Sequence, residues 1–204
     1  MIHHNETTCR ACGSPRLHTI VEFGLTPLAD RLLRQDQLDE PELMAPLTLV
    51  FCEECALAQI RETVDPEILF FAEYPYFSSV SPSLLRHFAA SAEDIMAERD
   101  LNSSSLVMEA ASNDGYMLKN FALAGIPVQG IDPAKAPAQA AIDAGIPTMV
   151  TFFGQELAAK LRAEGKAADI FLANNVLAHV PDLNGFVTGI RTIATGVAPS
   201  KMKE

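Results

Sequence analysis

The sequence predicts an α/β protein in which a Rossmann-like parallel sheet is preceded by a small zinc-binding module. Two observations predict this architecture. The four cysteines form two C-x-x-C pairs near the start of the chain, and the second half alternates strand-like with helix-like segments. Such alternation is typical of a parallel, doubly wound sheet. We therefore expect a four-cysteine zinc-binding module at residues 1–65, a connecting segment with a helix at 66–100, and the sheet domain at 101–204.

The zinc-binding module is expected to be rich in turns, because Pro27, Pro41 and Pro46 interrupt it. Two short strands are predicted at residues 47–52 and 57–64, on either side of the second cysteine pair.

A helix is predicted to begin after the connecting segment, at Ser81. The Ser81 side chain can cap the first turn, and Pro82 suits the first helical position. Apolar side chains then recur at helical spacing and form one face. They are Leu84, Leu85, Phe88, Ala92, Ile95 and Met96.

The alternating segments of the sheet domain follow one another along the chain. Strands are predicted at 106–111, 127–132, 147–153 and 169–174, and helices at 115–124, 134–144, 155–164 and about 182–195. Gly125, Gly145 and Gly165 end the first three of these helices, as glycine commonly does.

The four cysteines are predicted to bind one structural zinc ion, with two thiolates from each pair: Cys9, Cys12, Cys52 and Cys55. A cytosolic chain rarely uses structural disulfides, so paired C-x-x-C motifs indicate a metal. Free buried cysteines and disulfides are the alternative interpretations. Because four cysteines complete the site, the neighbouring histidines are expected on the surface; they are His3, His4 and His18.

A cofactor site is predicted at the carboxyl ends of the strands, where open parallel sheets bind their ligands. Polar and aromatic residues gather at those ends. They are Glu109, Asn113, Asp114 and Gly115 after the first strand, Asp132 after the second, Phe152 and Phe153 after the third, and Asn174, Asn175 and His179 after the fourth.

Each of these positions has a chemical reason. Gly115 lets the backbone approach a ligand, and Asp132 can accept hydrogen bonds from two ribose hydroxyls. An aromatic side chain can stack on adenine, and Asn174 offers donors and acceptors at the reacting end. S-adenosylmethionine (SAM) enzymes commonly show E-x-G-x-G-x-G in the first turn, but here Ala111 and Asn113 replace the first two glycines. A lone acid at a strand end is also a common helix cap.

Composition excludes several other classes of function. The formal net charge of −11 argues against a nucleic-acid partner, which needs basic side chains to neutralise phosphates. Apolar stretches are broken within about ten residues, far short of the roughly 20 that span a bilayer. The start of the chain lacks the pattern of a secretory signal. We therefore expect a cytoplasmic protein that binds neither nucleic acid nor membrane.

Taken together, a series of motifs resembles the zinc-binding sugar C-methyltransferases, a SAM-dependent class I family. The motifs are C-R-A-C-G-S, F-G-L-T-P-L-A-D-R, F-C-E-E-C, Y-P-Y-F-S-S, E-A-A-S-N-D-G-Y-M-L-K, G-I-D-P-A and A-N-N-V-L-A-H-V-P-D-L-N-G-F-V. The resemblance runs from Cys9 to about Gly196, and S-N-D-G is a family variant of the glycine pattern. It implies methylation of a carbon of a nucleotide-linked keto-deoxysugar.

The resemblance also implies a mechanism and roles for individual residues. A base removes the proton alpha to the ketone, and the enolate attacks the methyl group of SAM. Tyr74 or Tyr76 and His179 would face the sugar. SAM would be held by Glu109, Asn113, Gly115, Asp132 and Asn174. The tyrosines could instead pack at a domain junction, and His179 could cap the next helix.

The sequence departs from this family after Gly196-Val197, where only APSKMKE follows. The family continues with a strand bearing E-x-P-Y, a Glu-His-Tyr region that carries the proposed base, and a second Rossmann-like domain. We therefore expect a truncated form with an incomplete class I methyltransferase fold. The alternatives are a non-catalytic zinc- and SAM-binding remnant, a subunit that needs a partner chain, or a zinc interaction module without SAM.

The predicted last strand, residues 169–174, is apolar on both faces, as suits a buried parallel strand. In a complete fold of this type a fifth strand would pair beside it. We therefore expect an exposed edge here, open to self-association or to a partner fragment.

Overall fold

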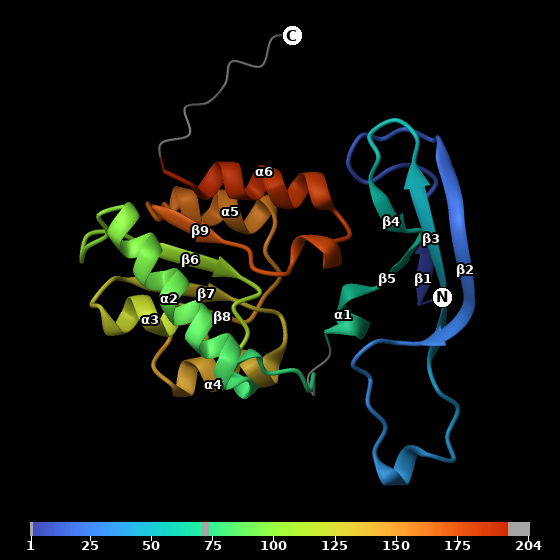
Figure 1. Ribbon diagram of the computed structural model, residues 1–204, viewed down its shortest axis with the longest axis horizontal. Helices are drawn as coiled ribbons and strands as arrows, with labels where there is room; N and C mark the ends of the chain where they lie inside the picture. Colours follow the sequence, from blue (N-terminus) through green and yellow to red (C-terminus); the bar gives the residue numbers. More distant parts are fainter. Residues whose placement is uncertain (1, 71–73, 196–204) are drawn as a thin grey trace. The chain divides into compact units, whose positions relative to one another are not determined.

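The computed structural model describes residues 2–70 and 74–195, which form two compact units (Figure 1). The first unit takes the chain up to Tyr76 together with Pro181–Asn184, and the second takes the remainder. Within the described residues, no helix has the length and apolar character needed to cross a membrane.

The first unit consists mainly of antiparallel strands. Strands β2, β3 and β4 form a three-stranded sheet in that order, and β1 pairs with β5. The elements in chain order are β1 (His3–Asn5), β2 (Leu17–Pro27), the 3-10 helix η1 (Gln35–Gln37), β3 (Met44–Cys52), β4 (Ala58–Ile60), β5 (Glu62–Val64) and α1 (Pro66–Leu69).

The first unit also contains strands that the sequence patterns did not indicate, β1 and β2. Strand β2 covers eleven residues, and its pairing with β3 shifts register between Thr19 and Val21 and again between Glu22 and Leu25. Such bulges break the alternation by which a strand is recognised. The strand predicted at 57–64 is divided, because β4 pairs with β3 whereas β5 pairs with β1.

The second unit contains a four-stranded parallel sheet in the order β8-β7-β6-β9, which confirms the predicted α/β class. The elements are η2 (Ser78–Val80), α2 (Pro82–Glu98), β6 (Val107–Ala110), α3 (Leu118–Leu123), β7 (Val128–Ile131), α4 (Lys135–Asp143), β8 (Thr148–Met149), α5 (Gln155–Ala163), β9 (Ile170–Leu172), η3 (Leu177–His179) and α6 (Leu183–Ile193). The Ser81 hydroxyl caps α2 as predicted and accepts from the Leu84 N–H at 3.4 Å.

Helices cover both faces of this sheet, with α2, α3 and α4 on one side and α5 and α6 on the other (Figure 1). Successive residues of β6 point to opposite faces. Val107 therefore packs in a cluster with Phe88 of α2 and Phe121 of α3. Its neighbour Met108 packs in a second cluster with Leu161 of α5. The carboxyl ends of the strands thus stand between two packed layers.

Both edge strands are shorter than predicted. Strand β8 pairs with β7 through two residues, and Val150 directly after it is 46% exposed. Strand β9 pairs with β6, and one isolated parallel bridge joins Ala168 to Ala194. The tail after Thr195 lies outside the described residues.

Candidate zinc and cofactor sites

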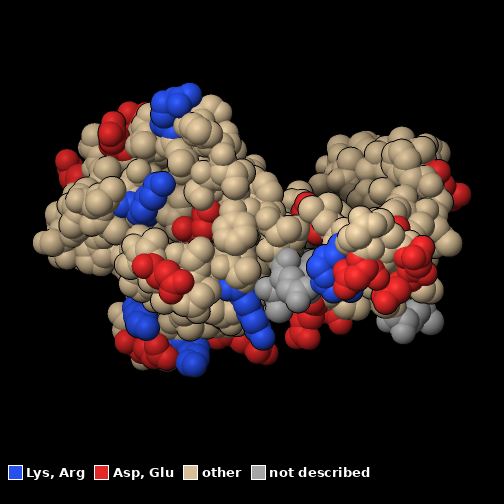
Figure 2. Space-filling view, turned by 90° about the horizontal axis from the view of Figure 1, so that it is seen from below, with Lys and Arg blue, Asp and Glu red and all other residues tan. Residues whose placement is uncertain are grey.

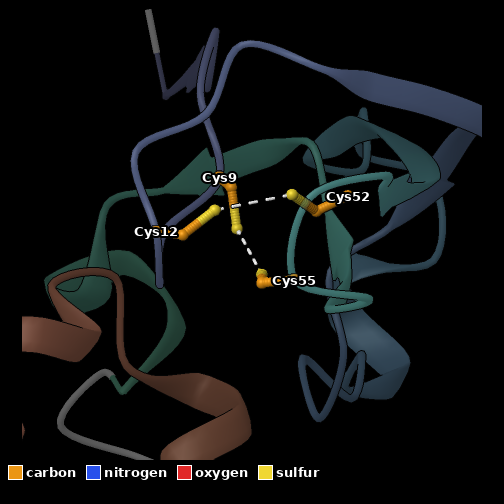
Figure 3. A group of neighbouring side chains, drawn as sticks. All are labelled: Cys9, Cys12, Cys52 and Cys55. Atoms are coloured by element: carbon orange, nitrogen blue, oxygen red, sulfur yellow. Dashed lines mark hydrogen bonds between the residues drawn. The ribbon is translucent and has the colours of Figure 1, made fainter.

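The four cysteine sulfurs converge on one point of the first unit (Figure 3). All four lie within 4.8 Å of one another; the Cys9 and Cys55 sulfurs are 3.6 Å apart, as are those of Cys12 and Cys52. Each pair lies on a tight turn that is followed by a residue in the left-handed conformation. These residues are Gly13, at φ +73°, and Ala56, at φ +64°.

The sulfur spacing identifies a metal site. Zinc binds thiolates at about 2.3 Å, so a tetrahedral site spaces its sulfurs by about 3.8 Å, whereas a disulfide bond is about 2.05 Å long. The cysteines are free thiols, and the 3.6 Å between their paired sulfurs is close to the spacing of a tetrahedral zinc site and far longer than a disulfide bond. A backbone hydrogen bond from Cys55, aided by one from Glu54, lowers the pKa of the Cys52 thiol to about 7. These hydrogen bonds favour the thiolate at Cys52, whereas burial raises the pKa of the Cys12 thiol and the neighbouring Cys12 sulfur raises that of the Cys55 thiol, in each case despite a backbone hydrogen bond.

The histidines of this unit lie outside the cluster of sulfurs. His3 and His4 belong to β1 and His18 to β2, and His4 Nε2 lies 3.3 Å from a carboxylate oxygen of Glu6. The group of residues within the described chain that could hold a metal consists of the four cysteines alone.

The turn after β6 has the backbone that a glycine-rich loop provides. Ala111, Asn113 and Gly115 all adopt positive φ, at 56°, 49° and 76°. These are the three positions at which the E-x-G-x-G-x-G pattern places glycine. Gly115 cannot be replaced easily, because a side chain there would meet Ile146 Cγ1 at 3.0 Å. The turn therefore keeps the required shape although two of its glycines are absent.

Glu109, at the end of β6, is fully buried and joins two strands of the sheet. Its Oε1 accepts from Asn174 Nδ2 at 2.9 Å and from the Tyr116 hydroxyl at 3.3 Å. Burial raises the pKa of Glu109 to about 8, more than these two hydrogen bonds lower it. The nearby carboxylates of Asp132 and Asp114 raise it further. Glu109 is thus an acid poised to carry a proton near neutral pH.

Asp132, which directly follows β7, is hydrogen-bonded to the turn that follows β6. Its two oxygens accept from the backbone N–H groups of Asn113 and Ala134, each at 2.8 Å. The side chain is 4% exposed, and burial raises its pKa. Each carboxylate oxygen has two acceptor sites, so both can still accept from a ligand hydroxyl.

The two aromatic candidates after β8 have different environments. Phe153 packs against Phe171 and Phe186, with ring centroids 4.6 and 5.2 Å away. Gly189 of α6 makes this possible, because a side chain there would meet Phe153 at 3.1 Å. Phe152 is 41% exposed. Phe153 is therefore committed to the core, and Phe152 is the ring of the two that a ligand can reach.

The side chains of Asn113 and Asp114 turn toward η2. Asn113 Oδ1 accepts from the Ser78 N–H at 2.8 Å, and Asp114 Oδ2 accepts from the Ser79 N–H at 3.1 Å. Both serines belong to the Y-P-Y-F-S-S motif, in which roles were predicted for the tyrosines only. No local pattern links them to a turn 35 residues away.

The remaining predicted residues lie in different units. Tyr74 and Tyr76 end the first unit, whereas Asn175, at φ +52°, and His179, at the end of η3, belong to the second. The Tyr74 hydroxyl donates to Asp30 Oδ2 at 3.1 Å. The roles predicted for these residues stay predictions, and Asp30 is a contact that sequence patterns did not indicate.

Charged side chains on the face drawn in Figure 2 are mixed in sign. Acidic and basic groups are interspersed among wide neutral areas, without a continuous basic stripe on the described residues of that face.

Comparisons with known proteins give the site its context. Residues 9–70 match the family model Methyltransf_13, described as "Putative zinc binding domain". The chain is 31% identical over 185 residues to the C-methyltransferase NovU of Streptomyces niveus, which covers 91% of this chain and 44% of that protein. The chain therefore spans less than half the length of this relative.

Solved structures with partial likeness include two methyltransferases. The magnesium protoporphyrin IX methyltransferase ChlM of Synechocystis PCC 6803, with bound SAM, has a TM-score of 0.43 at 20% identity, covering 55% of this chain and 57% of that one. The plantazolicin methyltransferase BpumL, in complex with SAH, has a TM-score of 0.38 at 12% identity, covering 57% and 51%. The zinc-binding domain match over residues 9–70 and the 31% identity along most of the chain support a relationship to the zinc-binding C-methyltransferases, of whose matched member this chain spans less than half.

Proposed function

We propose that this chain binds SAM at the carboxyl ends of β6, β7, β8 and β9, as part of a C-methyltransferase. The turn after β6 carries this proposal, because Ala111, Asn113 and Gly115 place positive φ where SAM enzymes have glycine. The relationship to a C-methyltransferase supports the same reaction class. The proposed substrate, a nucleotide-linked keto-deoxysugar, rests on the sequence resemblance.

When bound, SAM would supply an electrophilic methyl group. The proposed reaction forms a carbon–carbon bond to the carbon alpha to the sugar ketone, breaks the sulfur–methyl bond, and passes the alpha proton to a base. Asp132 would accept from the ribose hydroxyls, and Phe152 would stack on adenine. Asn174 would face the reacting end while Glu109 holds its amide in place. On the sequence resemblance alone, Tyr74 or Tyr76, together with His179, is proposed to face the sugar.

The zinc ion has a structural role in this proposal. Four thiolates complete a tetrahedral site and leave no open position for water or substrate. The ion would therefore shape the first unit, and the chemistry would fall to side chains.

Calorimetry with SAM and the purified chain tests the cofactor assignment. Asp132→Ala should weaken binding by roughly 1.5–3 kcal/mol, the scale of hydrogen bonds to a charged group. Asp143→Asn, an exposed change on α4, is the matched control and should bind like the wild type. A folded wild-type chain that binds no SAM would refute the assignment.

We also propose that β9 is a pairing edge for a second copy or a partner fragment. On the side away from β6, the described residues supply one bridge, from Ala168 to Ala194. Unpaired backbone groups on an apolar strand form a template for pairing. Sedimentation should show association that rises with concentration. A sharp monomer at high micromolar concentration, with slow amide exchange in β9, would contradict this.

The cytoplasm is the proposed location. The cysteines are free thiols that can bind zinc, and a reducing compartment keeps them so. Fractionation of the host cell would test this, and recovery of the protein outside the cytoplasm would refute it.

A further inference from the structure

Segment Phe77–Val80, which includes η2, lies against the turn that follows β6. The backbone N–H groups of Ser78 and Ser79 donate to Asn113 Oδ1 at 2.8 Å and Asp114 Oδ2 at 3.1 Å. Helix α2 begins directly afterward. Its Phe88 packs edge-on against Tyr116, with the two ring centroids 4.6 Å apart, and so anchors the helix. The segment is therefore held at both ends, and both serines are placed beside the first turn.

The order of strands decides which part of a ligand this turn would meet. The sheet runs β8-β7-β6-β9, so the proposed adenine contact at Phe152 and the proposed ribose contact at Asp132 follow β8 and β7. A SAM molecule laid in that direction extends its amino-acid end over β6. Ser78 and Ser79 would therefore meet the amino acid rather than the nucleoside.

Among the described residues, the Ser112 hydroxyl in this turn and two buried carboxyl oxygens near it lack a hydrogen-bond partner. The carboxyl oxygens are Glu109 Oε2 and Asp114 Oδ1, and Glu109 is fully buried. Buried polar atoms are rarely left without partners, so these oxygens point to a ligand that donates hydrogen bonds. A bound ammonium group would favour the ionised form of Glu109, so that both carboxylates can accept from it. Serine hydroxyls can in turn donate to a ligand carboxylate. Together these groups match both charges of an α-amino acid.

Building on the proposed function, we infer that Ser78 and Ser79 form the wall that binds the amino-acid end of the cofactor. Asn113 and Asp114 act as positioning residues that hold this wall against the turn, and the free oxygen of Asp114 faces the ammonium group.

Calorimetry with two ligands tests this inference on the whole chain. One ligand is SAM, and the other is 5′-methylthioadenosine, which keeps the nucleoside but lacks the amino acid. The double variant Ser78→Ala/Ser79→Ala should bind SAM roughly ten- to a hundredfold more weakly, the effect of losing hydrogen bonds to a charged group. Its affinity for 5′-methylthioadenosine should change less than about twofold. Ser103→Ala, in the exposed loop before β6, is the matched control.

A second variant tests how the wall is held. Asn113→Gly keeps the positive φ and removes the acceptor for the Ser78 N–H. It should speed amide exchange at Ser78 and weaken SAM more than 5′-methylthioadenosine. Unchanged exchange at Ser78 would overturn the positioning role.

Each remaining outcome of the two-ligand experiment is informative. Unchanged SAM affinity in the double serine variant overturns the inference. Equal weakening of both ligands also overturns it, because the segment would then support the whole site. A folded wild-type chain that binds neither ligand refutes the proposed function itself, and the inference fails with it. If the wild type binds both ligands but the double serine variant shows no selective loss of SAM affinity, the inference is refuted and the proposed function stands.

Discussion

The two units of this chain reach a stable fold by different means. The second unit buries large apolar side chains such as Phe121, Met108 and Leu161 in two clusters on either face of its sheet. The first unit has few, and Val50 is one of them. It buries polar groups such as Glu62, whose Oε2 accepts from the Thr48 N–H at 2.8 Å. A small unit with so little apolar core needs a metal or other crosslink.

The largest expected effect is the loss of zinc from the first unit. Structural zinc sites contribute an apparent ~10–16 kcal/mol in small modules, so chelation should unfold β2, β3 and β4 and leave β6 and β7 folded. Hydrogen exchange read separately in each unit checks this, with elemental analysis of zinc before and after. Returning zinc should restore protection. Full protection of β3 from exchange in a zinc-free chain would contradict the view that the first unit depends on zinc for its fold.

A cavity in the second unit is the reciprocal experiment. Phe121 is fully buried, and Phe121→Ala should cost about 3–5 kcal/mol of unfolding free energy. Leu123 lies on the same helix and is 86% exposed, so Leu123→Ala should change stability by less than about 0.5 kcal/mol. Denaturant unfolding measures both. Zinc content should stay constant, and its loss from a folded Phe121→Ala chain would show that the units depend on each other.

Stability of the second unit should fall as pH rises between about 5 and 8. The pKa of Glu109 is raised from its usual 4.5 to about 8, so in that window the folded chain holds a proton that the unfolded chain has lost. The slope for one such group is at most about 1.4 kcal/mol per pH unit. Glu109→Gln should flatten most of the decline.

Unfolding midpoints across this pH range check the effect. Glu98→Gln, an exposed change near the end of α2, is the control. A profile that is the same in the wild type and Glu109→Gln would show that Glu109 does not hold its proton in the folded chain.

The smallest effects compare two alanines with left-handed backbones, one in each unit. Ala56 follows the second cysteine pair at φ +64°, and Ala111 lies in the turn after β6 at φ +56°. Glycine removes the steric cost of this conformation, so each substitution should stabilise its own unit by about 1 kcal/mol. Ala56→Gly should slow zinc loss to a chelator, whereas Ala111→Gly should raise the unfolding midpoint of the second unit. If Ala56→Gly instead raised the unfolding midpoint of the second unit, or Ala111→Gly slowed zinc loss, the division into two units would be contradicted.

Short-range patterns made much of this molecule predictable. The spacing of Cys9, Cys12, Cys52 and Cys55 indicated zinc, because each turn supplies two thiolates whatever the path between them. Ser81 and Pro82 located the start of α2, and glycines located the ends of α3, α4 and α5. These signals depend on neighbours along the chain, so a local reading suffices.

Contacts between distant residues were decided by tertiary structure. Phe152 and Phe153 are indistinguishable as letters, and packing against Phe171 and Phe186 commits only the second ring to the core. The contact between Tyr74 and Asp30 spans 44 positions, and that between Ser78 and Asn113 spans 35. The sequence by itself determined the cysteine cluster and the alternation of strands and helices, because sterics and periodicity act between neighbours. Which side chains meet across the strand ends was decided by strand register and helix packing, which depend on the whole fold at once.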